Sequence, residues 1–133
     1  AWQGKVAADV LERVTFQAGD MLESIPAAHS DEDLYVFSAI YHCFNDTDSQ
    51  RILSNLKHAC REKKPWVLIA DAVLAETQAN STLAAIDMQM LMGTQGRERT
   101  LDEWQHLLAG SGFALVNVLD VRAFAKFLVL RRE

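Results

Sequence analysis

Two short runs of almost entirely apolar residues, 34–40 and 66–72, are separated by a stretch with a different periodicity. Continuous apolar runs of this length are typical of strands that are covered on both faces in a parallel sheet. Between them, apolar residues recur three and four positions apart, as on one face of a helix. The residues of this face are Ile52, Leu53, Leu56, Ala59 and Cys60, and Asp46 to Asp48 precede them as candidate cap residues. This strand–helix–strand order predicts a parallel pair joined by a crossover helix.

The same alternation continues on both sides of this unit. Helices are predicted at residues 2–11, 81–92 and 100–108, the last opened by a Thr100–Glu103 capping box and followed by Gly110 and Gly112. Strands are predicted at residues 14–18, 115–121 and 124–130. A very short turn separates the last two, so they should pair antiparallel. The pattern predicts an open α/β sheet with helices on both faces, in which ligands bind at the carboxyl ends of the strands.

Length and composition indicate one domain and narrow the classes of partner. The 133 residues carry a net charge of −5 and no basic stripe, which argues against nucleic acid and anionic membrane surfaces as partners. The apolar runs are far shorter than the ~20 residues of a membrane span, and no signal peptide is recognisable. Cys43 and Cys60 form no CxxC motif, so we expect reduced thiols and a cytoplasmic protein. The first residue is Ala rather than Met, as in an excised piece or a trimmed chain.

Ionisable side chains follow several of the predicted strands. Asp20 follows the first strand, His42 follows the second and Asp71 ends the third, so all three are expected at the ligand-binding edge. Glu98 lies in the charged run at residues 96–100, ahead of the last predicted helix. Each also has a plainer explanation: Asp20 in a turn, His42 as a surface or capping residue, and Glu98 in a solvated charged run. The residues alone leave these alternatives open.

Five motifs follow one another along the chain. They are Arg-Val…Gly-Asp-Met at 13–21, Tyr-His-x-Phe-x-Asp at 41–46, Val-Leu-Ile-Ala-Asp at 67–71, Gly-Arg-Glu-Arg-Thr-x-x-Glu-Trp at 96–104, and Leu-Leu…Gly-Phe at 107–113. In this order they resemble the C-terminal half of the plant-type and bacterial O-methyltransferases, the family of the caffeate, hydroxyindole and polyketide enzymes. The resemblance covers nearly the whole chain. It implies a Rossmann-like class I methyltransferase sheet, S-adenosylmethionine as cofactor, no metal, and a small aromatic acceptor that is methylated on a hydroxyl.

By this resemblance, His42 is the general base that takes the proton of the acceptor hydroxyl. Imidazole suits the role because its unperturbed pKa of about 6.5 lies near the working pH. Glu98 would orient His42 and stabilise its protonated ring. Asp71 stands where relatives often have a glutamate, which is one methylene longer. Arg97 and Arg99 are expected to pair with nearby carboxylates rather than to take part in catalysis.

The resemblance also assigns contacts with the cofactor and the acceptor. The Asp20 carboxylate would accept the exocyclic amine of adenine, and Met21 would pack on the ring. Ser38 lies where many relatives have a lysine near the cofactor. Met88 and Met92, on the predicted helix at 81–92, would line the acceptor pocket, since methionine adapts to flat aromatic molecules. The same spacing is equally ordinary for core residues, and both interpretations stay open.

The glycine-rich loop that binds the cofactor in this family does not occur in the 133 residues, and neither does a candidate ribose-binding acid. We therefore expect residues 1–133 to be the C-terminal part of a methyltransferase domain, truncated at its N-terminus. Such a chain should bind S-adenosylmethionine weakly or not at all and should be inactive alone. The alternative is a catalytically inactive binding or assembly module derived from these enzymes. An unrelated α/β domain is a third, less supported interpretation.

The resemblance leads to a specific topology. We expect a sheet of about five strands in the order 14–18, 34–40, 66–72, 124–130 and 115–121. If strand 34–40 does not pair with 14–18, it becomes an apolar edge that invites pairing with another chain. The surface that a missing domain would cover must also be buried somewhere, which predicts a homodimer.

Overall fold

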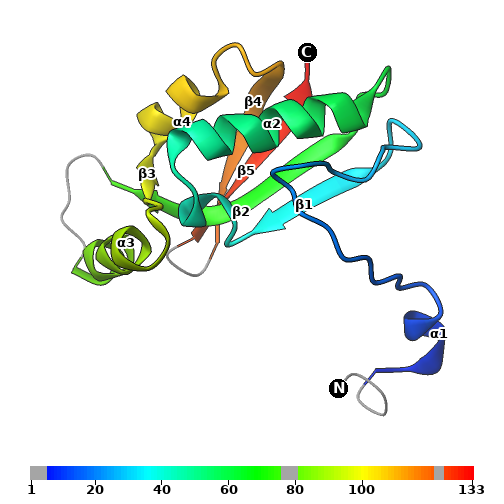
Figure 1. Cartoon of the computed structure of the whole chain (residues 1–133), viewed down its shortest axis with the longest axis horizontal. Coiled ribbons are helices and arrows are strands. Elements are labelled where there is room, and N and C mark those ends of the chain that lie inside the picture. Colours follow the sequence, from blue (N-terminus) through cyan, green and yellow to red (C-terminus); the bar gives the residue numbers. More distant parts are fainter. Residues whose placement is uncertain (1–5, 76–80, 122–124) are drawn as a thin grey trace.

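Strands and helices alternate along most of the chain. The computed structural model describes residues 6–75, 81–121 and 125–133 (Figure 1). The strands are β1 (Leu34–Ser38), β2 (Trp66–Leu74), β3 (Arg99–Thr100), β4 (Phe113–Asp120) and β5 (Ala125–Arg132). The helices are α1 (Ala8–Leu11), the short 3₁₀ helix η1 (Tyr41–Cys43), α2 (Asp46–Cys60), α3 (Ser81–Thr94) and α4 (Leu101–Leu108).

The sheet has five strands, of which β1, β2, β5 and β4 lie side by side in this order. β1 and β2 are parallel, with Leu34 opposite Trp66, whereas β5 runs antiparallel to both β2 and β4. β3 pairs in parallel with the end of β2, at Val73 and Leu74. The structure confirms the α/β class, the C-terminal antiparallel hairpin and the predicted order of these four strands. β3 was not predicted, because two residues are too few to show a periodicity.

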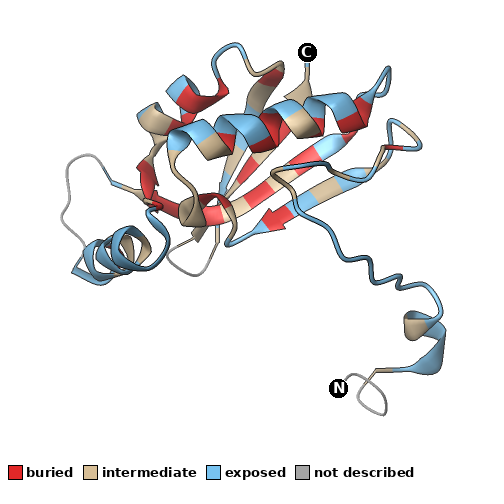
Figure 2. Cartoon of the chain, viewed as in Figure 1, coloured by how far each residue is buried: buried red, intermediate tan, exposed pale blue. Residues whose placement is uncertain are grey.

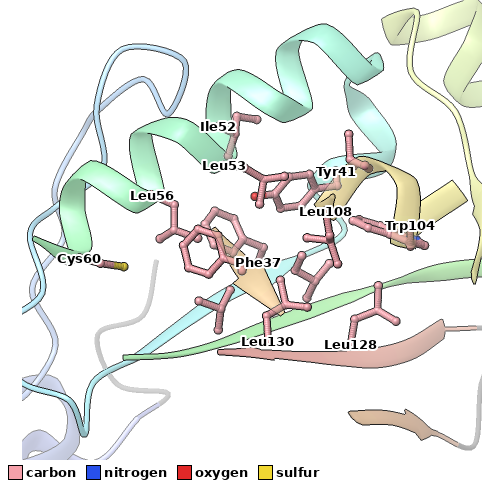
Figure 3. Close-up of a cluster of buried hydrophobic side chains, with 14 of the residues drawn as sticks. Phe37, Tyr41, Ile52, Leu53, Leu56, Cys60, Trp104, Leu108, Leu128 and Leu130 are labelled. Carbon is pink, nitrogen blue, oxygen red and sulfur yellow. The ribbon is translucent and has the colours of Figure 1, made fainter. Parts of the chain in front are cut away.

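α2 and α4 cover one face of the sheet, and the buried residues gather between them and the strands (Figures 1 and 2). Figure 3 shows this core, in which Tyr41 packs edge-on against Phe37 and Trp104, with ring centroids 5.3 and 5.6 Å apart. The other core residues are Ile52, Leu53, Leu56, Cys60, Val67, Ile69, Val73, Leu107, Leu108, Phe113, Leu128 and Leu130. Tyr41 of η1 belongs to this core, so its burial holds η1 against the sheet.

The opposite face of the sheet is open in the described part of the chain. Leu34, Val36 and Trp66 are exposed there, and the Arg131 guanidinium lies 4.3 Å from the centroid of the Trp66 ring. The prediction that the runs 34–40 and 66–72 are covered on both faces is therefore wrong for these residues, because α2 and α4 lie on the same side. β1 forms an edge of the described sheet.

Residues 14–18 do not form the predicted strand. This segment is exposed and follows α1, which lies away from the sheet (Figure 1). Val14 and Phe16 are 45% and 76% exposed. A strand is stabilised by pairing and by burial of one face more than by intrinsic preference, and residues 14–18 have neither. Of the helix predicted at 2–11, only residues 8–11 are helical, as α1; Val6 and Ala7 are not, and residues 1–5 lie outside the described residues, as does Phe124 of the predicted strand 124–130.

The two helices that cover the sheet begin as their sequences suggest. Asn45 caps α2, since its side chain accepts the Asp48 backbone N–H (2.9 Å), so the cap residue precedes the predicted Asp46. α4 has the predicted capping box: Thr100 Oγ1 accepts the Glu103 N–H (3.2 Å), and Glu103 Oε2 accepts the Thr100 N–H (2.8 Å). No helix among the described residues combines the length and apolar character needed to cross a bilayer.

Candidate active site

The carboxyl ends of β1 and β2 bring a histidine and an aspartate together. After β1, Ala39 adopts a left-handed conformation (φ 54°), and its N–H donates to the Ala70 carbonyl (2.9 Å). η1 follows, with His42 at its centre. The backbone N–H of Tyr41 donates to Asp71 Oδ2 (3.0 Å), so this carboxylate holds the turn that carries His42. Asp71 does not end the strand as predicted: it directly follows Ala70, the last β2 residue that pairs with β1, and β2 continues to Leu74. The parallel pairing of the two strands explains why these residues meet.

His42 lies between two buried carboxylates. Its Nδ1 is 2.8 Å from Glu98 Oε1 and 3.9 Å from Asp71 Oδ1. The His42 side chain is 17% exposed, whereas each of the two acidic side chains is 1% exposed. An ionised carboxylate can only accept a hydrogen bond, so we assign the ring hydrogen to Nδ1, which leaves the Nε2 lone pair free. The structure thus brings together three residues that the sequence placed in one site.

Burial and mutual repulsion shape the charges of this cluster. The pKa of Asp71 is raised to about 6, chiefly by burial and also by the neighbouring Glu98, while His42 and the backbone N–H groups of Tyr41 and His42 act in the opposite direction. Among the described residues, Asp71 Oδ1 and Glu98 Oε2 are buried without a hydrogen-bond partner. These acceptor atoms can stabilise positive charge on the ring. Burial, with Asp71 and Glu98, also raises the pKa of the Cys43 thiol, which keeps it protonated and a poor nucleophile.

The loop before β3 packs tightly on the turn that carries His42. A Cβ at Gly96 would lie 2.0 Å from the His42 carbonyl oxygen and 2.6 Å from the Cys43 carbonyl carbon, so a side chain does not fit there. Two residues later, the Glu98 backbone N–H donates to Asp87 Oδ1 on α3 (2.7 Å). Backbone contacts therefore place the Glu98 carboxylate on His42.

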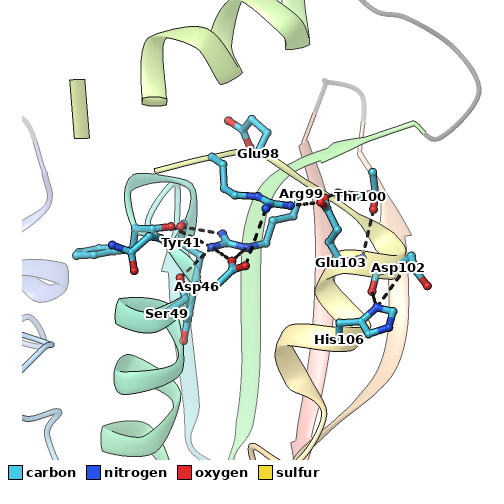
Figure 4. A network of polar contacts seen from close by, with 12 residues as sticks. Tyr41, Asp46, Ser49, Glu98, Arg99, Thr100, Asp102, Glu103 and His106 are labelled. Atoms are coloured by element: carbon cyan, nitrogen blue, oxygen red, sulfur yellow. Dashed lines mark hydrogen bonds and ion pairs between the residues drawn. The ribbon is translucent and has the colours of Figure 1, made fainter. Parts of the chain in front are cut away.

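Arg99 fixes the same turn from the side of β3 (Figure 4). Its side chain is 1% exposed and donates to the carbonyls of Tyr41 (Nη1, 3.1 Å) and Phe44 (Nη2, 2.9 Å). It also donates to Asp46 Oδ1 (Nε, 3.0 Å; Nη2, 2.8 Å) and to Ser49 Oγ (3.1 Å), at the start of α2. One arginine thus joins β3, η1 and α2. The predicted pairing of Arg99 with a carboxylate is confirmed, and its contacts with the carbonyls are additional.

Arg97 pairs with carboxylates as predicted, with Glu103 and with Asp46 (Nη1 to Oδ2, 3.9 Å).

Sequence reasoning missed two residues that shape the site, Gly96 and Asp87. Neither the close approach at Gly96 nor the contact of Asp87 with Glu98 was anticipated. A signal existed for each: Gly96 opens a charged motif, and Asp87 is the one ionisable residue in the sequence of α3.

The residues assigned to the cofactor lie beside β1. Gly19 and Met21 help to line a hollow of about 400 Å³ next to this strand, and Met21 also packs against the core. Asp20 and Ser38 are exposed and are not among the lining residues. Asp20 Oδ1 accepts the Leu22 backbone N–H (2.8 Å), so the turn explanation holds for one carboxylate oxygen. No group of three or more His, Cys, Asp or Glu side chains in the described ranges could hold a metal ion.

The methionines of α3 are not core residues. Met88 and Met92 are 57% and 81% exposed, and neighbouring Leu91 is 60% exposed. α3 lies beyond the end of β2, apart from the face that α2 and α4 cover (Figure 1). This excludes the core interpretation of the two methionines and leaves an apolar, exposed helix face near the loop that carries Glu98.

Comparison with known proteins agrees with the motifs. The O-methyltransferase domain family matches residues 3–114. The chain belongs to this O-methyltransferase family. It is 33% identical over 108 residues to 3'-hydroxy-N-methyl-(S)-coclaurine 4'-O-methyltransferase 2 of Papaver somniferum, a match that covers 79% of this chain and 29% of that protein. It is 34% identical over 108 residues to the acetylserotonin O-methyltransferase of Gallus gallus, covering 80% of this chain and 30% of that one. The chain thus spans about a third of the length of these curated relatives.

Solved structures of O-methyltransferases share the fold of this chain. The mitomycin 7-O-methyltransferase MmcR superimposes with a TM-score of 0.85 at 27% identity, over 99% of this chain and 37% of that one. CalO1, a methyltransferase in calicheamicin biosynthesis solved in its SAH-bound form, gives a TM-score of 0.77 at 30% identity, over 94% of this chain and 36% of that one. The described sheet is therefore a class I methyltransferase sheet.

Proposed function

We propose that these residues supply the catalytic half of an S-adenosylmethionine-dependent O-methyltransferase, which transfers a methyl group to a hydroxyl of a small aromatic acceptor. The observation that carries the proposal is the 2.8 Å contact between His42 Nδ1 and Glu98 Oε1 at the carboxyl ends of the strands. Family membership makes methyl transfer to oxygen the reaction to consider. The contact supports His42 as the base of that reaction.

His42 would act at Nε2, the ring nitrogen that the Glu98 contact leaves unprotonated. Nε2 takes the proton of the acceptor hydroxyl as the hydroxyl oxygen gains the methyl group, whose bond to the cofactor sulfur would break to leave a neutral thioether. The ring becomes positively charged, and Glu98, together with the buried Asp71 carboxyl, stabilises that charge. The proton then leaves Nε2 for solvent, which the 17% exposed side chain can reach.

The described residues supply only part of a binding site for the cofactor. Bound S-adenosylmethionine would supply an electrophilic methyl group. Met21, which lines the hollow beside β1, and the remaining oxygen of Asp20 could contact its adenine. Such contacts contribute ~1–3 kcal/mol, whereas micromolar affinity requires about −8 kcal/mol. We therefore expect calorimetry to detect at most very weak binding of S-adenosylmethionine or S-adenosylhomocysteine by the 133 residues alone.

The base is tested in an active assembly, in which the chain is joined to or complemented by a segment that carries a glycine-rich cofactor loop. We expect His42→Ala to reduce methyl transfer to a phenolic acceptor by about 10²–10⁴-fold, as general bases do, and Glu98→Gln to reduce it less. Steady-state turnover with radiolabelled cofactor measures both effects.

His58→Ala is the matched control, because His58 is an exposed histidine near the other end of α2. This variant should retain the parent rate. Full activity in His42→Ala with an unchanged circular dichroism spectrum would remove the proposed mechanism. An assembly that binds the cofactor tightly but methylates no acceptor would favour the inactive binding module instead.

A further inference from the structure

We propose that Asp87 is a positioning residue for the His42–Glu98 pair, and that it makes the placement of Glu98 depend on α3. Asp87 Oδ1 accepts the backbone N–H of Glu98 at 2.7 Å. Glu98 Oε1 in turn lies 2.8 Å from His42 Nδ1. A continuous chain of two short contacts therefore runs from α3 to the proposed base. The role in turnover rests on the proposed function, but the role in geometry does not.

The Asp87 contact holds the backbone of Glu98 between two neighbours whose positions are already fixed. On one side, Gly96 packs against the peptide between His42 and Cys43. On the other, Arg99 is paired with β2 in the sheet and buried. The Glu98 N–H lies between these two fixed points. If Asp87 is removed, the N–H loses its acceptor, and the loop can rotate to find another, which moves the side-chain carboxylate as well.

α3 is suited to move with a bound molecule. Among the described residues of α3, Leu83 is buried, whereas Met88, Leu91 and Met92 form an exposed apolar face. A helix with so little core of its own is positioned by the few polar contacts that it makes and by whatever covers its apolar face. An acceptor seated on this face would hold α3, and Asp87 would then hold Glu98 against His42. The geometry of the base would thus be set best when the acceptor is present.

Two variants separate this role from a general structural one. Asp87→Asn keeps an oxygen that can accept the Glu98 N–H, whereas Asp87→Ala removes it. Alanine is the best helix former, so Asp87→Ala should not disrupt α3. Gln89→Ala is the control, because Gln89 is exposed on the same helix.

The first measurement is ¹⁵N NMR of the 133-residue chain, which needs no methyl transfer. We expect the parent chain, Asp87→Asn and Gln89→Ala to show His42 as the Nδ1–H tautomer, with the Nδ1 proton protected by Glu98. Asp87→Ala should show faster exchange of that proton and of the Glu98 amide by about tenfold or more, which corresponds to roughly 1.4 kcal/mol. Unchanged His42 and Glu98 signals in a folded Asp87→Ala chain would overturn the proposal.

The second measurement is turnover in the active assembly. Asp87→Ala should lower kcat by ~10–100-fold, as small misplacements of a catalytic group do, without changing the KM for the cofactor. In a Glu98→Gln background the same substitution should cause little further loss, because both changes act on one contact. If the losses of kcat caused by Asp87→Ala and Glu98→Gln are additive, the proposal for Asp87 is contradicted, even where an inactive His42→Ala supports His42 as the base. If no assembly methylates an acceptor, the NMR result still decides the role of Asp87.

Discussion

Around His42, contacts with the backbone set as much of the geometry as contacts with the ring. Gly96 has no side chain, yet its backbone lies so close to the His42–Cys43 peptide that no Cβ fits. Asp71 Oδ2 accepts a hydrogen bond from the backbone of η1, while its Oδ1 lies 3.9 Å from His42 Nδ1. Each of these residues supports a separate prediction.

Gly96→Ala should destabilise the chain and displace the turn that carries His42. The added methyl group would lie 2.0 Å from the His42 carbonyl oxygen, so the backbone must shift. Overpacking of this kind typically costs about 1–3 kcal/mol, which urea denaturation would measure as a lower midpoint. Gly93→Ala is the control, because nothing lies within 4 Å of a Cβ at Gly93 in α3. Equal stability of the two variants would refute the close approach.

Asp71→Asn should change how stability depends on pH. The pKa of Asp71 rises from 3.8 to about 6 on folding, so folding favours the neutral carboxyl. The contribution of this group is therefore fully present below pH 4 and is lost as the pH rises through 6. A difference of this size corresponds to up to about 3 kcal/mol. Denaturation between pH 4 and 7.5 should show a larger loss for the parent chain than for Asp71→Asn; parallel curves would contradict the assignment.

The three ionisable residues of the site could be predicted from the sequence, whereas the residues that hold them in place could not. His42 follows one apolar run and Asp71 lies near the end of the other, and parallel strands of this kind end at a shared edge. Glu98 could be assigned only through the family motif, because its charged neighbours suggest a solvated run. The contact made by Asp87 depends on how α3 sits beside the loop, and periodicity carries no information about that packing.

At the scale of elements, Arg99 links three parts of the chain that share no sequence proximity. Its guanidinium bonds to carbonyls on both sides of His42 and to Asp46 and Ser49 in the first turn of α2. β3 is only two residues long, so this side chain, with the pairing to β2, fixes where the strand lies.

We expect Arg99→Met to cost about 1–3 kcal/mol for each of the Tyr41 and Phe44 carbonyls that loses its donor. Asp46 adds little to this cost, because its side chain is 56% exposed and can be solvated. Arg99→Lys should rescue little, since an ammonium group cannot reproduce the planar fork of five N–H donors. Arg97→Met provides the comparison: Arg97 is 40% exposed, and the loss of an exposed ion pair should cost below about 1 kcal/mol. Thermal and urea denaturation of the three variants would test this order, and a mild Arg99→Met would be inconsistent with it.

Elements with a strong apolar pattern were predicted well, and the failures have a common cause. β1, β2, α2 and the β4–β5 hairpin match their predicted positions within a few residues. The strand expected at residues 14–18 rested on the β-branched residues Val14 and Thr15, and its pairing with 34–40 was inferred from the family resemblance rather than from a residue pattern. Pairing and burial decide whether such a segment becomes a strand.

At the scale of the whole molecule, an apolar sheet face and an apolar helix face remain exposed in the described residues. Leu34, Val36 and Trp66 lie on the sheet face, and Met88 and Met92 lie on α3. Exposed apolar patches of this kind usually mark a surface that another molecule covers. We propose that isolated chains associate as homodimers through the sheet face and the neighbouring edge strand β1.

Sedimentation equilibrium at tens of micromolar should therefore show a dimer. Val36→Glu should shift the equilibrium toward monomer, because it places a charge on the proposed interface without disturbing the buried face. Met92→Glu, which changes the exposed helix instead, should leave the dimer intact. A monomeric parent chain would refute the proposal, and dissociation by Met92→Glu alone would assign the contact to α3.

The order of assembly during folding follows from the separation of His42 and Glu98, which are 56 residues apart in the chain. α2 and α4 are local structures and can form within microseconds, whereas the β1–β2 and β2–β3 pairings close long loops. The contact between the two side chains requires both pairings. Refolding chains should therefore regain helical circular dichroism before the Nδ1 proton of His42 becomes protected, and the His42–Glu98 contact should form only after both strand pairings.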